Sequence, residues 1–207
     1  MVFLVCVIDY GAGNLQSVVK ALAFIGQKAQ VTADPAQVLA ADRLIFPGVG
    51  AFGDAMNQLK SRGLDTAIAE YINADKPFLG ICLGLQLLFQ TSEESPGIAG
   101  LGILQGSIRR FPKIKGIKVP HIGWNSLEIT QNVAGAKLFA GLPNGAYMYF
   151  VHSYCLQSWD EVPVSAVCGY GVPFGAAVCR GNLHAVQFHP EKSGGAGIRL
   201  LQNFLEG

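Results

Sequence analysis

The sequence of 207 residues has little charge and no long apolar run. Only 14% of the residues are Asp, Glu, Lys or Arg, and the formal net charge is +1. A charge balance this close to zero gives no general attraction to nucleic acid or to an anionic membrane. No apolar run approaches the roughly 20 residues that span a bilayer, and the apolar start MVFLVCVI lacks a basic segment before it. The sequence therefore predicts neither a nucleic-acid-binding protein nor a membrane protein.

The sequence also lacks a disulfide framework and a metal-binding pattern. Its cysteines are odd in number, and no two of them have C-x-x-C spacing. They are Cys6, Cys82, Cys155, Cys168 and Cys179. The four histidines show no recognised spacing for metal ligands. We expect reduced thiols, a cytoplasmic location, no metal and no cofactor.

What the sequence has in abundance is apolar residues, which make up half of the chain. In the first half, strand-like runs such as residues 2–8, RLIFPG and PFLGI alternate with helical spacing, as in Leu15 to Ile25 and in LQLLF. From Gly106 onward, strand-like pieces such as GSIRRF, NSLEIT and AYMYFVHSY are separated by Gly, Pro and Asn. We expect one α/β domain over residues 1–207. It should be doubly wound, with a mostly parallel central sheet, antiparallel additions to that sheet in the C-terminal half, and helices on both faces.

One cysteine lies where an apolar strand is expected to turn into a helix. The segment Gly80-Ile81-Cys82-Leu83-Gly84 has the form of a nucleophile elbow, with Cys in place of the Ser of G-x-S-x-G. Small residues on both sides allow close backbone approach around a strained turn, and the N-terminus of the following helix favours a thiolate. The alternative is a buried structural cysteine, because Cys is among the most often buried residues.

A thiol nucleophile needs a base and a group that orients the base, and QFHPEKSGG offers both. His189 and Glu191 are two positions apart, so they project from the same face of an extended backbone, and Pro190 disfavours helix. By itself this segment also fits a surface turn. Together with Cys82 it predicts a Cys-His-acid triad.

A third candidate segment is FPGVGAFGDAM, in which a strand ends at Pro47. The backbone that follows can present an unpaired N–H of Val49 or Gly50 beside the thiol, where it would stabilise an oxyanion together with the N–H of Leu83. An ordinary strand-to-helix loop explains the same Pro and Gly equally well.

These segments together resemble the class I glutamine amidotransferases, which hydrolyse glutamine through a thioester. The resemblance covers residues 8 to 195 and is strongest to the glutaminase subunits of imidazole glycerol phosphate synthase, in histidine biosynthesis. It rests on DYGAGNLQSV, PGVGAFGDAM, GICLGLQLLF, KVPHIGWN, HSY and QFHPEKSG. Leu85, where Met is common in the family, and Ser153, where Thr also occurs, are small departures.

The resemblance implies roles for individual residues. Cys82 would be the nucleophile, His189 the general base and then acid, and Glu191 its orienting partner. The oxyanion would be held by backbone N–H groups, and the substrate L-glutamine by hydrogen-bonding groups that add no charge near the thiolate. The residues implied are Val49, Gly50 and Leu83 for the oxyanion, and Gln86, Ser153 and Tyr154 for glutamine.

The resemblance also implies a partner, a (βα)₈-barrel synthase that receives the ammonia and forms a heterodimer with this subunit. Glutamine hydrolysis would be slow alone and fast with the synthase. The residues expected to face the barrel are Asn14, Trp124, Asn125, Lys192 and Ser193. Five cations in residues 109–118, Arg109, Arg110, Lys113, Lys115 and Lys118, form a basic strip that fits an interaction surface or a solvated loop equally well.

Several other interpretations of the sequence have to be weighed against this one. Gly11 and Gly13 after a strand suggest dinucleotide binding, but Gln16 occupies the third glycine position of that pattern. An amidotransferase with another ammonia acceptor, a cysteine hydrolase without an acceptor, and an inactive relative that only binds a partner are the remaining alternatives. The intact set of Cys82, His189 and Glu191 argues against the inactive relative.

Overall fold

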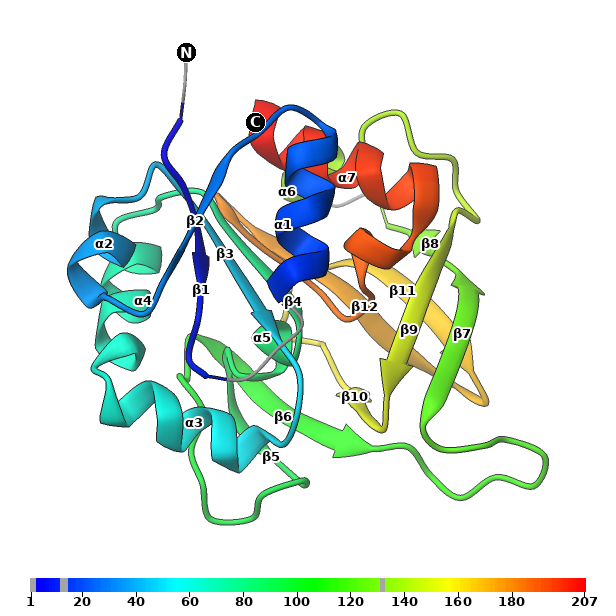
Figure 1. Ribbon diagram of the computed structural model, residues 1–207. Coiled ribbons are helices and arrows are strands. Elements are labelled where there is room, and N and C mark those ends of the chain that lie inside the picture. The colour runs from blue at the N-terminus through cyan, green and yellow to red at the C-terminus, as the bar shows by residue number, and fades with distance from the viewer. Residues whose placement is uncertain (1–2, 12–14, 131–132) are drawn as a thin grey trace.

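The structure is a computed structural model that describes residues 3–11, 15–130 and 133–207 (Figure 1). Five parallel strands form the centre of its main sheet, and each lies beside the next in the order given. They are β2 (Ala29–Thr32), β1 (Val5–Ile8), β3 (Arg43–Gly48), β4 (Phe78–Cys82) and β13 (Leu183–Val186). Because these strands are parallel, their carboxyl ends meet at one edge of the sheet.

The strands of the second half extend the same sheet, mostly in antiparallel pairs. After β13 the sheet continues through β12 (Val172–Arg180), β10 (Tyr154–Leu156), β6 (Leu104–Arg110) and β5 (Phe89–Ser92). A branch from β12 adds β11 (Val164–Tyr170) and then β8 (Glu128–Ile129). Only the pair of β5 and β6 in this half is parallel among the described strands. The expected parallel centre with antiparallel additions is confirmed.

Helices cover both faces of the sheet (Figure 1). One face carries α2 (Pro35–Ala40), α3 (Phe52–Ser61) and α4 (Leu64–Asn73), and the other carries α1 (Leu15–Phe24), α6 (Val133–Leu138) and α7 (Gly194–Glu206). Strand β1 shows why both faces must be covered. Its Cys6 and Ile8 pack into one apolar core while Val5 and Val7 pack into the other, as the two-residue period of a strand requires.

Two local expectations were wrong. Apart from its last residue, Tyr154, which begins β10, the segment AYMYFVHSY does not join the main sheet, because β9 (Tyr147–His152) pairs with β7 (His121–Ser126) in a separate two-stranded sheet. The helix expected at LQLLF is a single turn, α5 (Leu83–Gln86), and the chain becomes strand β5 at Phe89. A helix this short is marginal on its own, so pairing of β5 with β6 decides the conformation of the residues after it. No helix in the described part of the chain combines the length and apolarity needed to cross a membrane.

Candidate active site

Cys82 lies at the carboxyl end of the central strand β4, in the strained turn that the sequence predicts. Its φ is +56°, which is rare for a residue with a side chain, and it is directly followed by α5. The flanking glycines make the turn possible. A Cβ on Gly84 would collide with the carbonyl oxygen of Phe46 on β3, and a Cβ on Gly80 would lie 3.0 Å from the carbonyl oxygen of Gly84. The elbow therefore holds the thiol at the sheet edge, where it is 7% exposed.

His189 and Glu191 follow the neighbouring strand β13, which pairs in parallel with β4. The His189 Nδ1–H donates to Oε1 of Glu191 at 2.8 Å, and both side chains are buried, with 4% and 3% exposed. Glu191 lies in the single-turn 3₁₀ helix η1 (Pro190–Lys192), so the tight turn brings its carboxylate back to the imidazole. This hydrogen bond fixes the tautomer that leaves Nε2 free to act as a base.

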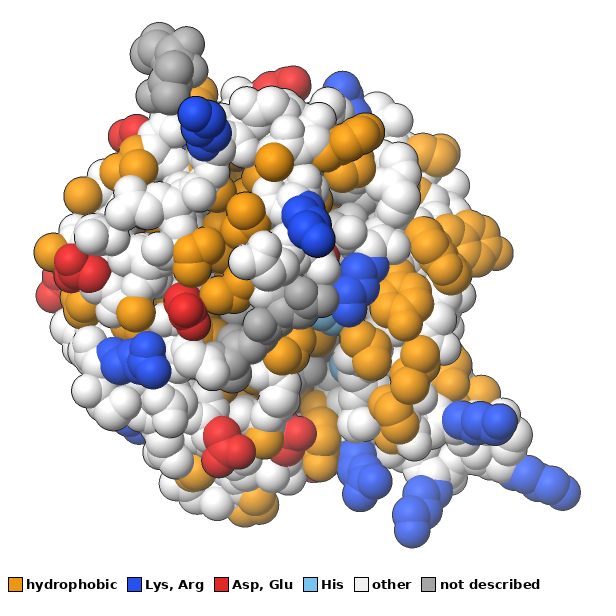
Figure 2. Space-filling view, viewed as in Figure 1, with side chains coloured by type: hydrophobic (Ala, Val, Ile, Leu, Met, Phe, Trp, Pro, Cys, Tyr) orange, Lys and Arg blue, Asp and Glu red, His pale blue; other side chains and the backbone are white. Residues whose placement is uncertain are grey.

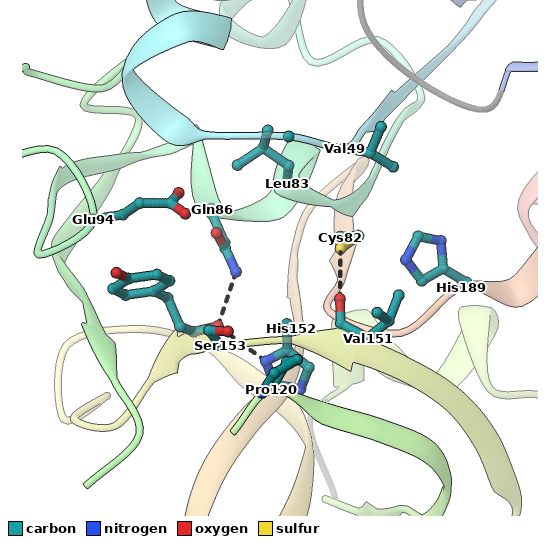
Figure 3. A pocket seen from close by; sticks show the side chains of 12 residues that line it. Val49, Cys82, Leu83, Gln86, Glu94, Pro120, Val151, His152, Ser153 and His189 are labelled. Carbon is teal, nitrogen blue, oxygen red and sulfur yellow. Dashed lines mark hydrogen bonds between the residues drawn. The ribbon is translucent and has the colours of Figure 1, made fainter. Parts of the chain in front are cut away.

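The second ring nitrogen of His189 faces the thiol. Nε2 is buried and has no hydrogen-bond partner among the described residues, and Figure 3 shows the ring beside Cys82. Burial alone would lower the pKa of His189, but Cys82 and Glu191 outweigh burial and raise that pKa to about 10. The sulfur does not reach full hydrogen-bond geometry with Nε2, so their attraction in this conformation is electrostatic. Cys82 and Glu191 therefore favour the protonated form of the His189 imidazole.

The thiol and imidazole open into a cavity of about 360 Å³. Every residue predicted from the sequence for the oxyanion or for glutamine lines this cavity with Cys82 and His189 (Figure 3). These residues are Val49, Gly50, Leu83, Gln86, Ser153 and Tyr154. Segments from four separate parts of the chain thus converge on a space of the size that small-molecule sites have.

Four further lining residues were not predicted from the sequence, although two of them lie within KVPHIGWN and HSY: Glu94, Pro120, Val151 and His152. Glu94 follows β5, and its Oε2 accepts a hydrogen bond from the backbone N–H of Phe52 at 2.8 Å. It brings the only carboxylate among the lining residues. Its position depends on long-range hydrogen bonds between the start of α3 and the segment after β5, and the surrounding TSEESPG has no recognisable motif.

The expected partner-facing residues lie in different surroundings. Trp124 lies on β7 and is 55% exposed. Ile122 on the same strand and Tyr147 on β9 are exposed as well. Lys192 is also exposed. We call Ile122, Trp124 and Tyr147 the ribbon patch, and Figure 2 shows hydrophobic side chains gathered on this side of the molecule.

Three other residues expected at the partner surface differ from that picture. Ser193 is buried. Its hydroxyl donates to the carbonyl of His189 at 2.6 Å and accepts from the N–H of Tyr149 at 2.9 Å. Its contacts tie His189 to β9, and its place at a partner surface stays a prediction. Asn125 is half-buried and donates to the carbonyl of Gly169 at 2.9 Å. Asn14 lies outside the described residues.

The basic strip runs from the end of β6 into the loop before β7. All five of its cations are exposed, and the loop extends from the body of the molecule below β7 (Figures 1 and 2). Phe111, which interrupts the strip, is buried against the rings of His152, Tyr170 and Phe174. The strip is therefore anchored at its base by an aromatic core residue. No group of three or more His, Cys, Asp or Glu suited to a metal ion occurs in residues 3–11, 15–130 and 133–207.

Comparison with known proteins places this site in a family. Residues 6–207 match the model of the glutamine amidotransferase class-I family. Two solved structures share the fold. A glutamine amidotransferase has a TM-score of 0.76 and 22% sequence identity, and the match covers 98% of this chain and 97% of that chain. PurLQS from Thermotoga maritima has a TM-score of 0.75 and 19% sequence identity, and the match covers 100% of this chain and 99% of that chain. The chain belongs to the class I glutamine amidotransferases.

Relatives with higher identity narrow the assignment. The imidazole glycerol phosphate synthase subunit HisH of Rhodopirellula baltica is 49% identical over 97% of this chain and 96% of its own length. The HisH subunit of Moorella thermoacetica is 50% identical over 98% and 94%. The chloroplastic imidazole glycerol phosphate synthase hisHF of Arabidopsis thaliana is 48% identical, and the match covers 97% of this chain but 34% of that protein. Within its family, the chain groups with the HisH subunits.

Proposed function

We propose that this chain hydrolyses L-glutamine to glutamate and ammonia at Cys82, as the glutaminase subunit of imidazole glycerol phosphate synthase. One observation carries the proposal: a strained, cavity-lining thiol faces an imidazole that a buried carboxylate holds at 2.8 Å. A structural cysteine needs none of these features, whereas acyl transfer needs all of them.

The proposed chemistry proceeds in two half-reactions. His189 Nε2 takes the thiol proton, and the Cys82 sulfur forms a bond to the carboxamide carbon while the carbonyl electrons move to oxygen. When the tetrahedral intermediate collapses, the C–N bond breaks and the imidazolium returns its proton to the leaving nitrogen, releasing ammonia. Water, deprotonated by the same imidazole, then attacks the thioester. The C–S bond breaks, glutamate leaves and the thiol regains its proton. Glu191 stabilises the imidazolium in both halves.

Backbone N–H groups would stabilise the oxyanion. Leu83 presents its N–H at the start of α5, and Val49 and Gly50 line the cavity wall beside it. In this conformation the Val49 N–H lies near the buried hydroxyl of Tyr10. Burial raises the pKa of Tyr10 and the Val49 amide opposes that rise, although the contact falls short of full hydrogen-bond geometry. A rotation of the Gly48–Val49 peptide, which Gly48 can accommodate because it has no side chain, would turn the Val49 N–H toward the substrate oxygen.

The cavity also contains groups suited to the α-ammonium and α-carboxylate of glutamine. Gln86 donates one side-chain N–H to the carbonyl of Tyr154 at 2.9 Å and the other to Oε1 of Gln187 at 3.0 Å. Both of its donors are used, so we assign its remaining oxygen, together with the carboxylate of Glu94, to the α-ammonium. The segment of Ser153 and Tyr154 would hold the α-carboxylate.

The ammonia would pass to a (βα)₈-barrel synthase subunit. The hisHF relative supports this pairing, because its name joins both subunits and this chain matches only 34% of its length. We place the barrel against the ribbon patch, Lys192 and the basic strip. The ribbon patch is apolar and partly aromatic, and the exposed Lys192 and basic strip would supply the polar rim of such an interface.

A labelling experiment tests the nucleophile and the substrate together. We expect acivicin, a glutamine-mimicking electrophile, to form one adduct on the intact chain, at Cys82, and excess glutamine to slow its formation. Peptide mass spectrometry identifies the labelled residue. An adduct at another cysteine, or unchanged labelling in the presence of glutamine, would contradict the proposal.

Activation by the partner needs a separate measurement. Glutamine hydrolysis by this subunit should rise about 100-fold or more when the barrel synthase and its substrate are added, because one oxyanion donor is worth roughly 100- to 1,000-fold in rate. Equal rates with and without the synthase would reject the peptide rotation. Replacing the barrel with acceptor enzymes for anthranilate or nucleotides should give no ammonia transfer, which separates this function from those of related amidotransferases.

The interface assignment has a matched control. Trp124→Ala should weaken binding of the synthase by about 30-fold, because buried aromatic anchors carry about 2 kcal/mol or more of interface energy. Phe24→Ala removes an aromatic ring that is 79% exposed on α1, outside the proposed surface, and should leave binding unchanged. Equal losses for both variants, measured by calorimetry, would place the partner elsewhere.

A further inference from the structure

Gln187 lies directly behind the nucleophile and has no part in the mechanism described so far. It follows β13, and the parallel register that pairs Val186 with Ile81 brings it level with Cys82. Its neighbour Phe188 packs into an apolar core, so Gln187 and His189 project to the opposite side, two positions apart. Gln187 has no exposed surface, and a buried amide must be hydrogen-bonded to be tolerated there.

The orientation of the Gln187 amide follows from its neighbours. A backbone carbonyl can only accept, so the carbonyl of Tyr154 at 2.9 Å requires nitrogen on that side of the Gln86 amide. That nitrogen lies 3.0 Å from Gln187, which must therefore present its oxygen. The Gln187 nitrogen then faces the other way and donates to the Cys82 sulfur at 3.7 Å. The chain of donors thus runs from Gln86 through Gln187 to the reacting atom.

This contact favours the ionised form of the sulfur. The thiol donates weakly to the carbonyl of Val151 at 3.9 Å, an interaction that disappears when the proton leaves. The N–H of Gln187 remains and becomes a hydrogen bond to a charged acceptor, which is about twice as strong as a neutral one. Helix α5 has only one turn, so few aligned peptide dipoles contribute to stabilising the charge. The Gln187 amide adds a donor to the sulfur that does not depend on the helix.

We propose that the Gln187 side-chain amide is a catalytic donor that stabilises the Cys82 thiolate, and that Gln86 fixes its orientation. The inference rests on the proposed glutaminase site and adds one residue to it. It also links the two tasks of the site, because the Gln86 amide assigned to glutamine binding is the one that orients the donor to the nucleophile.

Two substitutions separate this role from simple packing. Gln187→Glu keeps the side-chain shape and the oxygen that accepts from Gln86, but at a pH where the carboxylate is ionised it replaces the donor with an acceptor. Gln187→Met removes both the donor and the acceptor. The readout is the pH dependence of iodoacetamide alkylation at Cys82, followed by peptide mass spectrometry on the intact chain, with circular dichroism confirming that each variant is folded.

We expect the alkylation midpoint to move to higher pH in both variants. At pH 7 the rate should fall about tenfold for Gln187→Met, which corresponds to the loss of one hydrogen bond to a charged group, and further for Gln187→Glu. The fall in kcat for glutamine should follow the same order. A wild-type alkylation profile in Gln187→Glu, with a shifted one in Gln187→Met, would show that Gln187 only holds Gln86 and would overturn the proposal.

The chain contains a matched control at another cysteine. Gln157 donates to the sulfur of Cys155 at the same distance, 3.7 Å, away from the cavity. Gln157→Met should leave both the Cys82 profile and glutamine hydrolysis unchanged, and an equal shift in this variant would also overturn the proposal. Failure of the proposed function looks different, because the wild-type chain would then not form the acivicin adduct at Cys82.

Discussion

The two ends of strand β13 place histidines in opposite electrostatic surroundings. His184, within the strand, lies against Phe204, and burial lowers the pKa of its imidazole to about 4. His189, just beyond the carboxyl end, is also buried, yet Cys82 and Glu191 raise its pKa to about 10. Burial is common to both residues. What differs is the neighbouring groups that can carry negative charge, which Cys82 and Glu191 supply to His189 at the carboxyl edge of the parallel strands.

The cysteines show the same contrast. Burial raises the pKa of Cys6 and raises those of Cys155, Cys168 and Cys179 to about 12. All four lie inside the protein as small apolar side chains. Cys82 differs because a strained turn places it at the cavity, next to the imidazole of His189. Chemical reactivity in this protein is therefore set by position relative to the sheet edge, and the residue type alone does not identify it.

The largest test of this contrast removes the thiol at the edge. Cys82→Ala should lower kcat for glutamine hydrolysis on the order of 10⁶-fold, because loss of a nucleophile removes the covalent route entirely. Cys155→Ala is the control, since it removes a buried sulfur that does not line the cavity, and kcat should stay within about twofold while stability falls by roughly 1 kcal/mol. Ammonia release in a coupled assay measures both. Comparable losses of activity would mean that the edge position is not what matters.

A second test removes the charge that distinguishes His189. Glu191→Gln preserves shape but replaces the carboxylate with a neutral amide, so kcat should fall about 10⁴-fold, as for other triads that lose the acid. The pKa of His189 should fall as well, because a major cause of its rise is gone. The pH profile of kcat/KM and the imidazole resonance in NMR spectra report these effects. A variant with wild-type rates would show that Glu191 has only a structural role.

A third test compares all five thiols in one experiment. At pH 7, a thiol with a pKa of about 12 has about 1,000-fold less thiolate than one at the ordinary value of 9.0. Cys155, Cys168 and Cys179 should therefore react with iodoacetamide about 1,000-fold more slowly in the folded chain than in the unfolded chain, whereas Cys82, which lines the cavity, should be labelled first. Peptide mass spectrometry gives the rate at each site. In denaturant the five rates should converge, and persistent differences there would contradict an origin in the fold.

The sequence predicted the triad because its signals are local. The elbow needs small residues within two positions of Cys82, and the His189–Glu191 pair is set by a two-residue spacing around Pro190. The fold class was predictable for the same reason, since strand and helix periodicities are read within short windows. Ser153 and Tyr154 were found only through family resemblance, because no spacing rule connects them to Cys82.

The features that the sequence did not predict depend on packing between distant segments. Glu94 is held at the cavity by the first N–H of α3, and Gln187 reaches the sulfur because β13 pairs with β4. The single-turn length of α5 could not be read from LQLLF, since residues 83–89 are all buried and show no polar face. The burial of Ser193 could not be read from the sequence either, because its hydroxyl ties η1 to β9 through contacts between distant segments.

The smallest predicted effect concerns stability and has opposite signs at the two ends of β13. The folded-state pKa of His184, about 4, lies below the ordinary value of 6.5, so the unfolded chain binds the proton more readily between these values. Stability should therefore fall as the pH drops through this window. His184→Gln should remove up to about 3 kcal/mol of that loss.

For His189, whose pKa is raised to about 10, the stabilisation is full below pH 6.5 and is lost as the pH rises through 10. Urea unfolding from pH 4 to pH 10 gives the free energy of unfolding of wild type, His184→Gln and His189→Gln. The value for His184→Gln should diverge from that of wild type as the pH falls, and the value for His189→Gln should approach that of wild type as the pH rises. Parallel stability curves for all three chains would mean that neither histidine changes its proton affinity on folding.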